Sequence, residues 1–381
     1  MSNINDIPEL ERGEYTETIY GDTCSDEPAN SENAEDIVRG IELAMKLETR
    51  PVFLEGAAAR LTQLGVPCKA EDTQLILAEV RRRFNDKLGI SCPKAVENWC
   101  RGGNTGVTNR KNNYDLCYAL EMDYDETAVF FQKTYLTIPF IVKSKEDAVF
   151  MYCLYHKRPY SVVKGLLEKS KGFVSQEKAH TSTAQIRSVI LETDDDEKFL
   201  RYLSEHCYDK EQQFQLARDL IIKEVNDVKE ILQKYEKDRI LSAKRLNSMT
   251  IEALLGYKYQ RSDKKLKDSG LPKRFTESLP NDATLGDIIN GNRASYELLR
   301  KTLMLLKFYN FYFGADNDSR ESVRANLMDL RGELNYALNS CGFARLYVCH
   351  PFDCLLLYCA NSFDPIDTLY CVIQNGQNPF L

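Results

Sequence analysis

The stretch of sequence that decides the fold is TQLILAEVRRRFNDKLGISCPKAVENWCRGG, residues 73–103. Its first half carries apolar side chains at helical spacing, at Leu75, Leu77, Val80, Phe84 and Leu88. In its second half Ser91 can cap a helix, Pro93 suits a first helical turn, and two glycines end the pattern. The sequence therefore predicts an amphipathic helix over about 70–89, a turn, and a short helix of about two turns.

Similar patterns extend in both directions from this stretch. They cover residues 34–47, 52–65, 112–122, 124–136, 147–155 and 160–168, and helical patterns return over 283–375. From Asp209 to Asn247 apolar residues recur at steps of three and four, which predicts one long amphipathic helix with partial coiled-coil character. Its single apolar stripe favours a scaffold helix packed along the body, and a homodimerisation helix is the alternative. The fold class that follows is all-α.

The charge of the chain is unevenly distributed. The formal net charge is −7, but residues 1–36 hold eleven acidic residues and one basic residue, so the rest of the chain is slightly basic at +3. That N-terminal segment lacks periodicity, and we expect an acidic, disordered tail. Residues 256–274 carry seven basic and two acidic residues and are expected to form a basic linker, for which a phosphate-contacting arm is the alternative.

The twelve cysteines are scattered among apolar residues without a CxxC pair, and the N-terminus lacks a basic and apolar leader pattern. We therefore expect reduced, buried thiols in a cytoplasmic protein. The apolar run at 354–360 is too short to span a bilayer, so no membrane association is expected. Cys354 and Cys359 lie five residues apart, about 140° around a helix, which disfavours a shared metal.

Catalytic signatures are missing from the sequence. It contains no HExxH, GxSxG or P-loop motif, and its four histidines offer few places for acid–base chemistry. We therefore expect a non-enzymatic protein with no cofactor and no metal.

The C-terminal third of the sequence restates the first module. DAVFMYC at 147–153 matches DCLLLYC at 353–359, and the helix, polar loop and Tyr/Leu-rich helix over 96–122 have a counterpart over 285–308. An ordered series of such matches indicates a diverged duplication. We expect two diverged helical modules joined by a long central helix. The expected organisation is an acidic tail 1–36, a first module 37–170, a central helical region 171–255, a basic linker 256–282 and a second module 283–381.

The first module has the outline of a helix-turn-helix unit over 73–122, in which a short second helix follows a turn. Residues 81–113 contain eight basic and two acidic residues. A local charge of +6 is suited to the phosphates of nucleic acid.

The pattern SCPKAVENWCRGG, residues 91–103, with NRKNNYDLCYALEMDYDET, residues 109–127, resembles the Cro/repressor-type helix-turn-helix family, in variants found in larger bacterial proteins. The tight turn of small residues usual in that family is not evident ahead of Ser91. The resemblance implies that Val96 and Trp99 pack inward. It also implies the set of DNA-contacting residues Lys94, Glu97, Asn98, Arg101, Asn104, Arg110, Lys111, Arg82 and Arg83.

Within this set the resemblance assigns Lys94, Glu97, Asn98 and Arg101 to the groove, and the loop bases Arg110 and Lys111 to the backbone. The corresponding part of the second module offers only Asn290, Asn292, Arg293 and Arg300, and is expected to be a structural copy.

The function expected from the sequence is that of a transcription regulator that binds double-stranded DNA. The alternative is a regulator or adaptor whose helix-turn-helix-like module binds a protein partner. That alternative would be favoured if the 92–102 helix were buried or its face were occluded by acidic residues.

Overall fold

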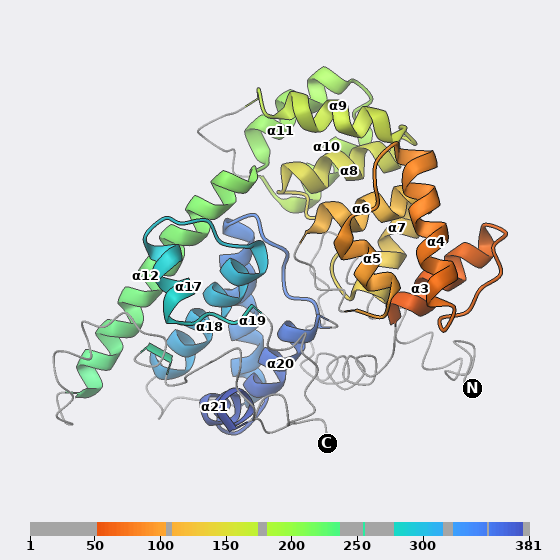
Figure 1. Ribbon diagram of the computed structural model, residues 1–381. Helices are drawn as coiled ribbons and strands as arrows, with labels where there is room; N and C mark the ends of the chain where they lie inside the picture. The colour runs from red at the N-terminus through yellow and green to blue at the C-terminus, as the bar shows by residue number, and fades with distance from the viewer. Residues whose placement is uncertain are drawn as a thin grey trace.

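The computed structural model describes residues 52–103, 109–173, 181–236, 254–255, 278–314, 323–348 and 350–375. Over these residues the regular structure is helical, with no strand, which confirms the all-α fold class (Figure 1). Within the same residues, no helix combines the length and the apolar composition needed to cross a membrane.

The first half of the described chain builds one core. Its elements are α3 Val52–Gln63, α4 Thr73–Arg83, the π-helical turn η2 Phe84–Leu88, α5 Lys94–Cys100, α6 Arg110–Ala119, α7 Tyr124–Phe130, the π-helical turn η3 Phe131–Tyr135, α8 Lys145–Tyr155, α9 Tyr160–Ser170, α10 Thr183–Glu192 and α11 Asp196–His206. Many aromatic side chains pack within this core. The Tyr114 ring, for example, stacks on Phe150 with ring centres 4.5 Å apart.

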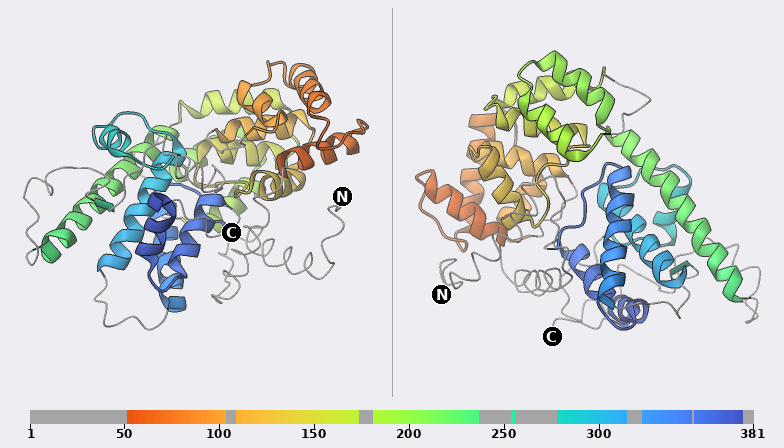
Figure 2. Two further views of the ribbon diagram at one scale, coloured as in Figure 1. Left: turned by 60° about the horizontal axis from the view of Figure 1, so that its bottom comes forward. Right: turned by 180° about the vertical axis from the view of Figure 1, so that it is seen from behind.

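The second half builds a separate core. Its elements are α12 Lys210–Glu236, α17 Asp282–Ile289, α18 Tyr296–Gly314, α19 Val323–Ser340, α20 Pro351–Ala360 and α21 Pro365–Asn375. Helix α12 runs along the flank of this half, beside α18 (Figure 2). Val52 and Leu136 of the first half also pack into the second core, so the two halves touch through apolar side chains.

The division between the two cores corrects the expected central region 171–255. Helices α10 and α11 place Ile190 and Phe199 in the first core, whereas α12 places Ile221 and Val225 in the second. The region is therefore not a unit of its own. Because the apolar stripe of α12 is buried within the chain, α12 acts as the scaffold helix that the sequence favoured. The expected acidic tail, residues 237–247 of the expected long helix, and linker residues 256–277 lie outside the described residues.

Each core contains a buried arginine–aspartate pair. In the first, Arg110 at the start of α6 donates from Nε and Nη2 to Asp147 Oδ2 on α8, at 2.9 and 2.6 Å. In the second, Arg300 on α18 holds Asp353 near the start of α20. Asp147 and Asp353 are the first residues of the two matching motifs at 147–153 and 353–359.

Candidate nucleic-acid interface

Helices α3, α4 and α5 pack against one another, and a turn at 89–93 joins α4 and η2 to α5. The turn begins at Gly89, whose φ of +63° lies in the left-handed region that glycine adopts without a steric penalty. This residue reverses the chain after η2, so that Ile90 to Pro93 lead into the short helix. The chain thus turns ahead of Ser91 through a single left-handed glycine, without the run of small residues usual in the resembled family.

Helix α5 has one buried and one exposed side. Val96, Trp99 and Cys100 are buried, and the Trp99 ring lies 5.8 Å from the rings of both Phe53 and Tyr135. The inward packing of Val96 and Trp99 is confirmed. It fixes the helix to the first core and leaves the opposite side to solvent.

The exposed side of α5 presents Lys94, Asn98 and Arg101 to solvent. Among the ion pairs that the described residues form, none involves Lys94. All three side chains belong to the set that the sequence assigned to the groove. The other member of that group, Glu97, is half-buried between two arginines.

Glu97 links α5 to α4. Its Oε1 accepts a hydrogen bond from Arg81 Nε at 2.7 Å, and its Oε2 lies 3.4 Å from Arg101 Nη2. The hydrogen bond from Arg81, with the nearby charges of both arginines, lowers the pKa of Glu97, which is therefore ionised at neutral pH. Arg81 was absent from the predicted site, although the Arg81 side chain is 49% exposed and lies beside α5. We call Arg81, Lys94, Glu97, Asn98 and Arg101 the α5 face.

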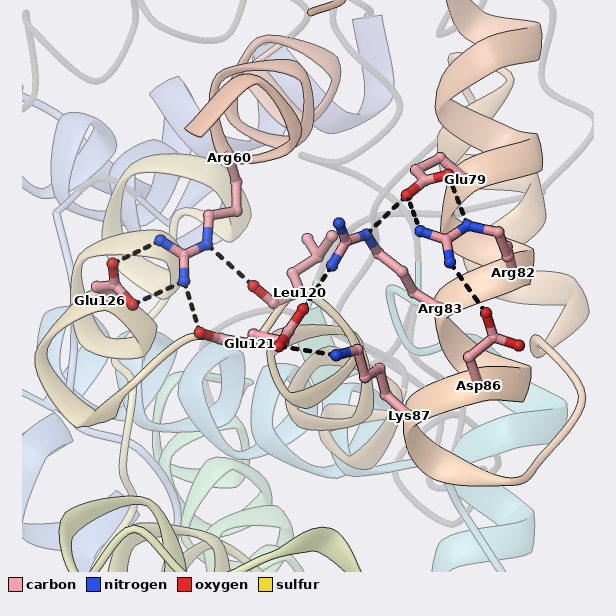
Figure 3. A network of polar contacts seen from close by, with 9 residues as sticks. All are labelled: Arg60, Glu79, Arg82, Arg83, Asp86, Lys87, Leu120, Glu121 and Glu126. Atoms are coloured by element: carbon pink, nitrogen blue, oxygen red, sulfur yellow. Dashed lines mark hydrogen bonds and ion pairs between the residues drawn. The ribbon is translucent and has the colours of Figure 1, made fainter. Parts of the chain in front are cut away.

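Arg82 and Arg83 differ from Arg81 in that each of them is held by two carboxylates (Figure 3). Arg82 donates to Glu79 and to Asp86, and Arg83 donates to Glu79 and to Glu121. The Arg83 side chain is only 6% exposed, which removes it from any surface contact. Helical phase carried the signal for this burial, because Arg83 follows the buried Val80 by three residues.

Glu121 is the centre of the network in Figure 3. Its carboxylate accepts from Arg83 Nη1 at 2.8 Å and Lys87 Nζ at 2.9 Å. Its φ of +52° is strained for a residue with a side chain, and Arg60 holds this conformation by donating to the carbonyls of Leu120 and Glu121. The network joins α3, α4, η2 and the end of α6, and so stabilises the frame beneath α5.

The two predicted loop bases are also committed to partners within the chain. Arg110 is buried against Asp147 and donates to the carbonyls of Ile138 and Pro139. The prediction that it contacts a nucleic-acid backbone is therefore wrong, since its guanidinium does not reach solvent. Lys111 is partly exposed and pairs with Asp115 at 2.6 Å. Asn104 lies outside the described residues.

In the folded chain, acidic residues from outside the segment 81–113 neutralise part of its positive charge. The segment 81–113 contains only two acidic residues, but Glu79 and Glu121, which lie just outside it, pair with Arg82, Arg83 and Lys87. A charge count along the sequence cannot include partners that only the fold brings close. The net positive charge is thus concentrated on the α5 face, where Glu97 is the one carboxylate beside Arg81, Lys94 and Arg101 among the described ion pairs.

The second module differs at the corresponding place. Its short helix α17 ends under α12, where Arg218 donates to the carbonyl of Ile289 from Nε at 3.2 Å and from Nη2 at 2.7 Å. Two of the four residues that the sequence offered in the second module have partners within the chain or lie in its core: Arg300 is buried, and Asn292 donates to Asp287. These contacts favour a structural copy, as the sequence suggested.

The described residues hold free cysteines and no group of possible metal ligands. None of the ten cysteines in the described residues forms a disulfide, and seven of the ten are buried. Within the described part of the chain, no three His, Cys, Asp or Glu side chains are grouped to hold a metal ion. Comparison with known proteins found no match to a family model, a curated protein or a solved structure.

Proposed function

We propose that this chain is a non-enzymatic DNA-binding regulatory protein of the helix-turn-helix type, with α5 as the helix that enters the major groove. One arrangement carries the proposal: Val96 and Trp99 pin α5 to the core, while Lys94, Asn98 and Arg101 are exposed. An α-helix with its side chains is about 10–12 Å in diameter, which fits a major groove about 12 Å wide.

The exposed side chains have the chemistry for base and phosphate contacts. Asparagine recognises adenine through paired hydrogen bonds, and arginine recognises guanine in the same way. Lys94, which forms no ion pair with any other described residue, supplies an ammonium for a phosphate or a guanine edge. Arg110 and Arg83 are excluded from this function, since both are buried. The interface therefore relies on fewer phosphate contacts than the sequence suggested.

The test is a salt titration of binding to a random-sequence DNA duplex, followed by fluorescence anisotropy. The intact chain is compared with a triple variant carrying Lys94→Ala, Asn98→Ala and Arg101→Ala. We expect the logarithm of the binding constant to fall linearly with log salt, and each lost phosphate contact to reduce the slope by about 0.9.

The matched control for the triple variant is Lys171→Ala with Lys223→Ala. Lys171, at the end of α9, is 71% exposed, and Lys223, on α12, is 65% exposed. Both are remote in sequence from α5, so their loss should leave binding unchanged. Binding that is absent at low salt, or equal in the triple variant and the intact chain, contradicts the proposal.

A second candidate function is that of an adaptor whose first module binds a protein partner. The observation in its favour is that carboxylates already neutralise Arg82, Arg83 and Lys111, which weakens attraction to a polyanion. It predicts that the intact chain fails to bind duplex DNA. It also predicts that a purified partner binds the intact chain but loses affinity for the triple variant.

A further inference from the structure

The chain enters the described structure beside α5. The first described residue is Val52, and the ring of the next residue, Phe53, lies 5.8 Å from the ring of Trp99 on α5. Whatever precedes Val52 is therefore attached close to α5, on its core-facing side, and reaches the α5 face by passing around the short helix. The preceding sequence is the most acidic part of the chain.

The acidic residues are within reach of the α5 face. All eleven lie in residues 6–36, which we call the acidic segment, and fifteen residues separate it from Val52. Fifteen residues span at most on the order of 50 Å. Helix α5 itself is only about 10 Å long. Covalent attachment at this distance gives the acidic segment a high effective concentration at the α5 face.

The α5 face carries the complementary charge. Lys94 adds a positive charge to the group in which Arg81 and Arg101 share the single carboxylate of Glu97, so the face has a net charge of +2. The Arg81 and Arg101 side chains are 49% and 44% exposed. By contrast, the carboxylates of Glu79, Asp86 and Glu121 already hold the neighbouring cations on α4 and η2 (Figure 3).

We propose that the acidic segment binds the α5 face of its own chain, where its carboxylates take the positions that DNA phosphates would occupy. The contact is electrostatic, so it weakens as salt rises. The docking itself is independent of the proposed function. Its consequence, a reduced affinity for DNA, rests on that function.

The docking is tested on the full-length chain by photo-cross-linking. A photoreactive p-benzoylphenylalanine replaces Asn98, and the cross-linked peptides are identified by mass spectrometry at 50 mM NaCl. We expect cross-links to residues 6–36 that decline at 500 mM NaCl. They should disappear in a neutralised chain, in which Asn or Gln replaces all eleven acidic residues. The same photoreactive group at Lys171 on the distant α9 side serves as the control and should give none.

The basic linker residues 256–274 are the competing site for the acidic segment. If the acidic segment binds there instead, the Asn98 position gives no cross-link to residues 6–36, and the proposal is overturned. Cross-links that persist unchanged at 500 mM NaCl or in the neutralised chain also overturn it, because they would not depend on charge.

The consequence for DNA is tested with the same neutralised chain and a random-sequence duplex. We expect the neutralised chain to bind roughly tenfold more tightly than the intact chain at 50 mM NaCl, because the competing carboxylates are gone. A synthetic peptide of residues 1–36, added in trans, should reverse this gain. Equal binding by the two chains overturns the inference while leaving the proposed function intact. Charge-dependent cross-links without DNA binding by either chain support the docking and refute the proposed function.

Discussion

Arg300 binds Asp353 through both carboxylate oxygens, with Nη1–Oδ1 and Nη2–Oδ2 distances of 2.6 Å each. The backbone N–H of Tyr347, six residues before Asp353, donates to the same carboxylate. Arg300 also donates to the carbonyls of Arg345 and Ala344, which lie eight and nine residues before Asp353. Asp147 has a similar arrangement: Arg110 donates to one of its oxygens, Oδ2, and the N–H six residues before Asp147 and the carbonyls eight and nine residues before it take the same roles. The sequence match between 147–153 and 353–359 thus extends to the hydrogen bonds of their first residues.

Because these pairs are buried, removing one charged member should destabilise the chain more than removing both. Asp353→Asn removes the carboxylate that pairs with the buried Arg300 guanidinium, and we expect it to lower the free energy of unfolding by about 3–5 kcal/mol. The double change Arg300→Met with Asp353→Leu removes both charges and should cost clearly less. Urea denaturation followed by circular dichroism measures both. A double variant that is as unstable as Asp353→Asn would contradict the prediction.

The same pair predicts a dependence of stability on pH. Burial alone would raise the pKa of Asp353, but the Arg300 guanidinium, helped by His350, outweighs burial and holds the pKa well below its ordinary value. A depressed carboxyl pKa contributes stability above the unfolded value of about 3.9, and the contribution is lost as pH falls toward the folded pKa. The stability difference between the intact chain and Asp353→Asn should therefore narrow below about pH 4. It is measured by urea denaturation between pH 2.5 and 7, and a constant difference would refute the assignment.

The sequence predicted the positions of the helices better than the ion pairs that their charged side chains form. Helical spacing located α4 and η2 because burial of Val80 and Phe84 on one side is a local property of the chain. The exposed positions of Lys94 and Asn98 followed from the same phase, once Val96 and Trp99 were assigned to the core.

Ion pairs between distant residues could not be predicted in this way. Arg110 pairs with Asp147, 37 residues away, and nothing in its own segment distinguishes it from an exposed loop base. The available signal was the repeat, because an Arg-Lys pair at 110–111 recurs at 300–301. In the structure Arg300 is buried as Arg110 is, so the recurring arginine marks a position in the core of each half.

The turn before α5 predicts a conformational cost at Gly89. An added Cβ there would meet no atom within 4 Å, but the φ of +63° disfavours any residue with a side chain. We expect Gly89→Ala to lower the free energy of unfolding by about 1 kcal/mol, as measured by urea denaturation.

Gly165 provides the matched control for Gly89. It lies within α9 at an exposed position, where a Cβ also meets no atom within 4 Å and φ is not positive. Gly165→Ala should raise stability by about 0.5–1 kcal/mol, because alanine favours a helix interior. Equal effects of the two substitutions would argue against a left-handed turn at Gly89.

The last prediction concerns the effect of the Glu97 carboxylate on DNA binding. Glu97→Gln removes the negative charge that Arg81 and Arg101 share, and frees both guanidiniums for phosphates. We expect tighter binding to a random-sequence duplex and a salt slope steeper by about 1–2, measured by fluorescence anisotropy. Glu168→Gln is the control, since Glu168 pairs with the exposed Lys171 outside the network of Figure 3 and its loss should leave the slope unchanged. Weaker binding by Glu97→Gln would instead indicate that the carboxylate contacts a base directly, as a glutamate does when it accepts a hydrogen bond from cytosine.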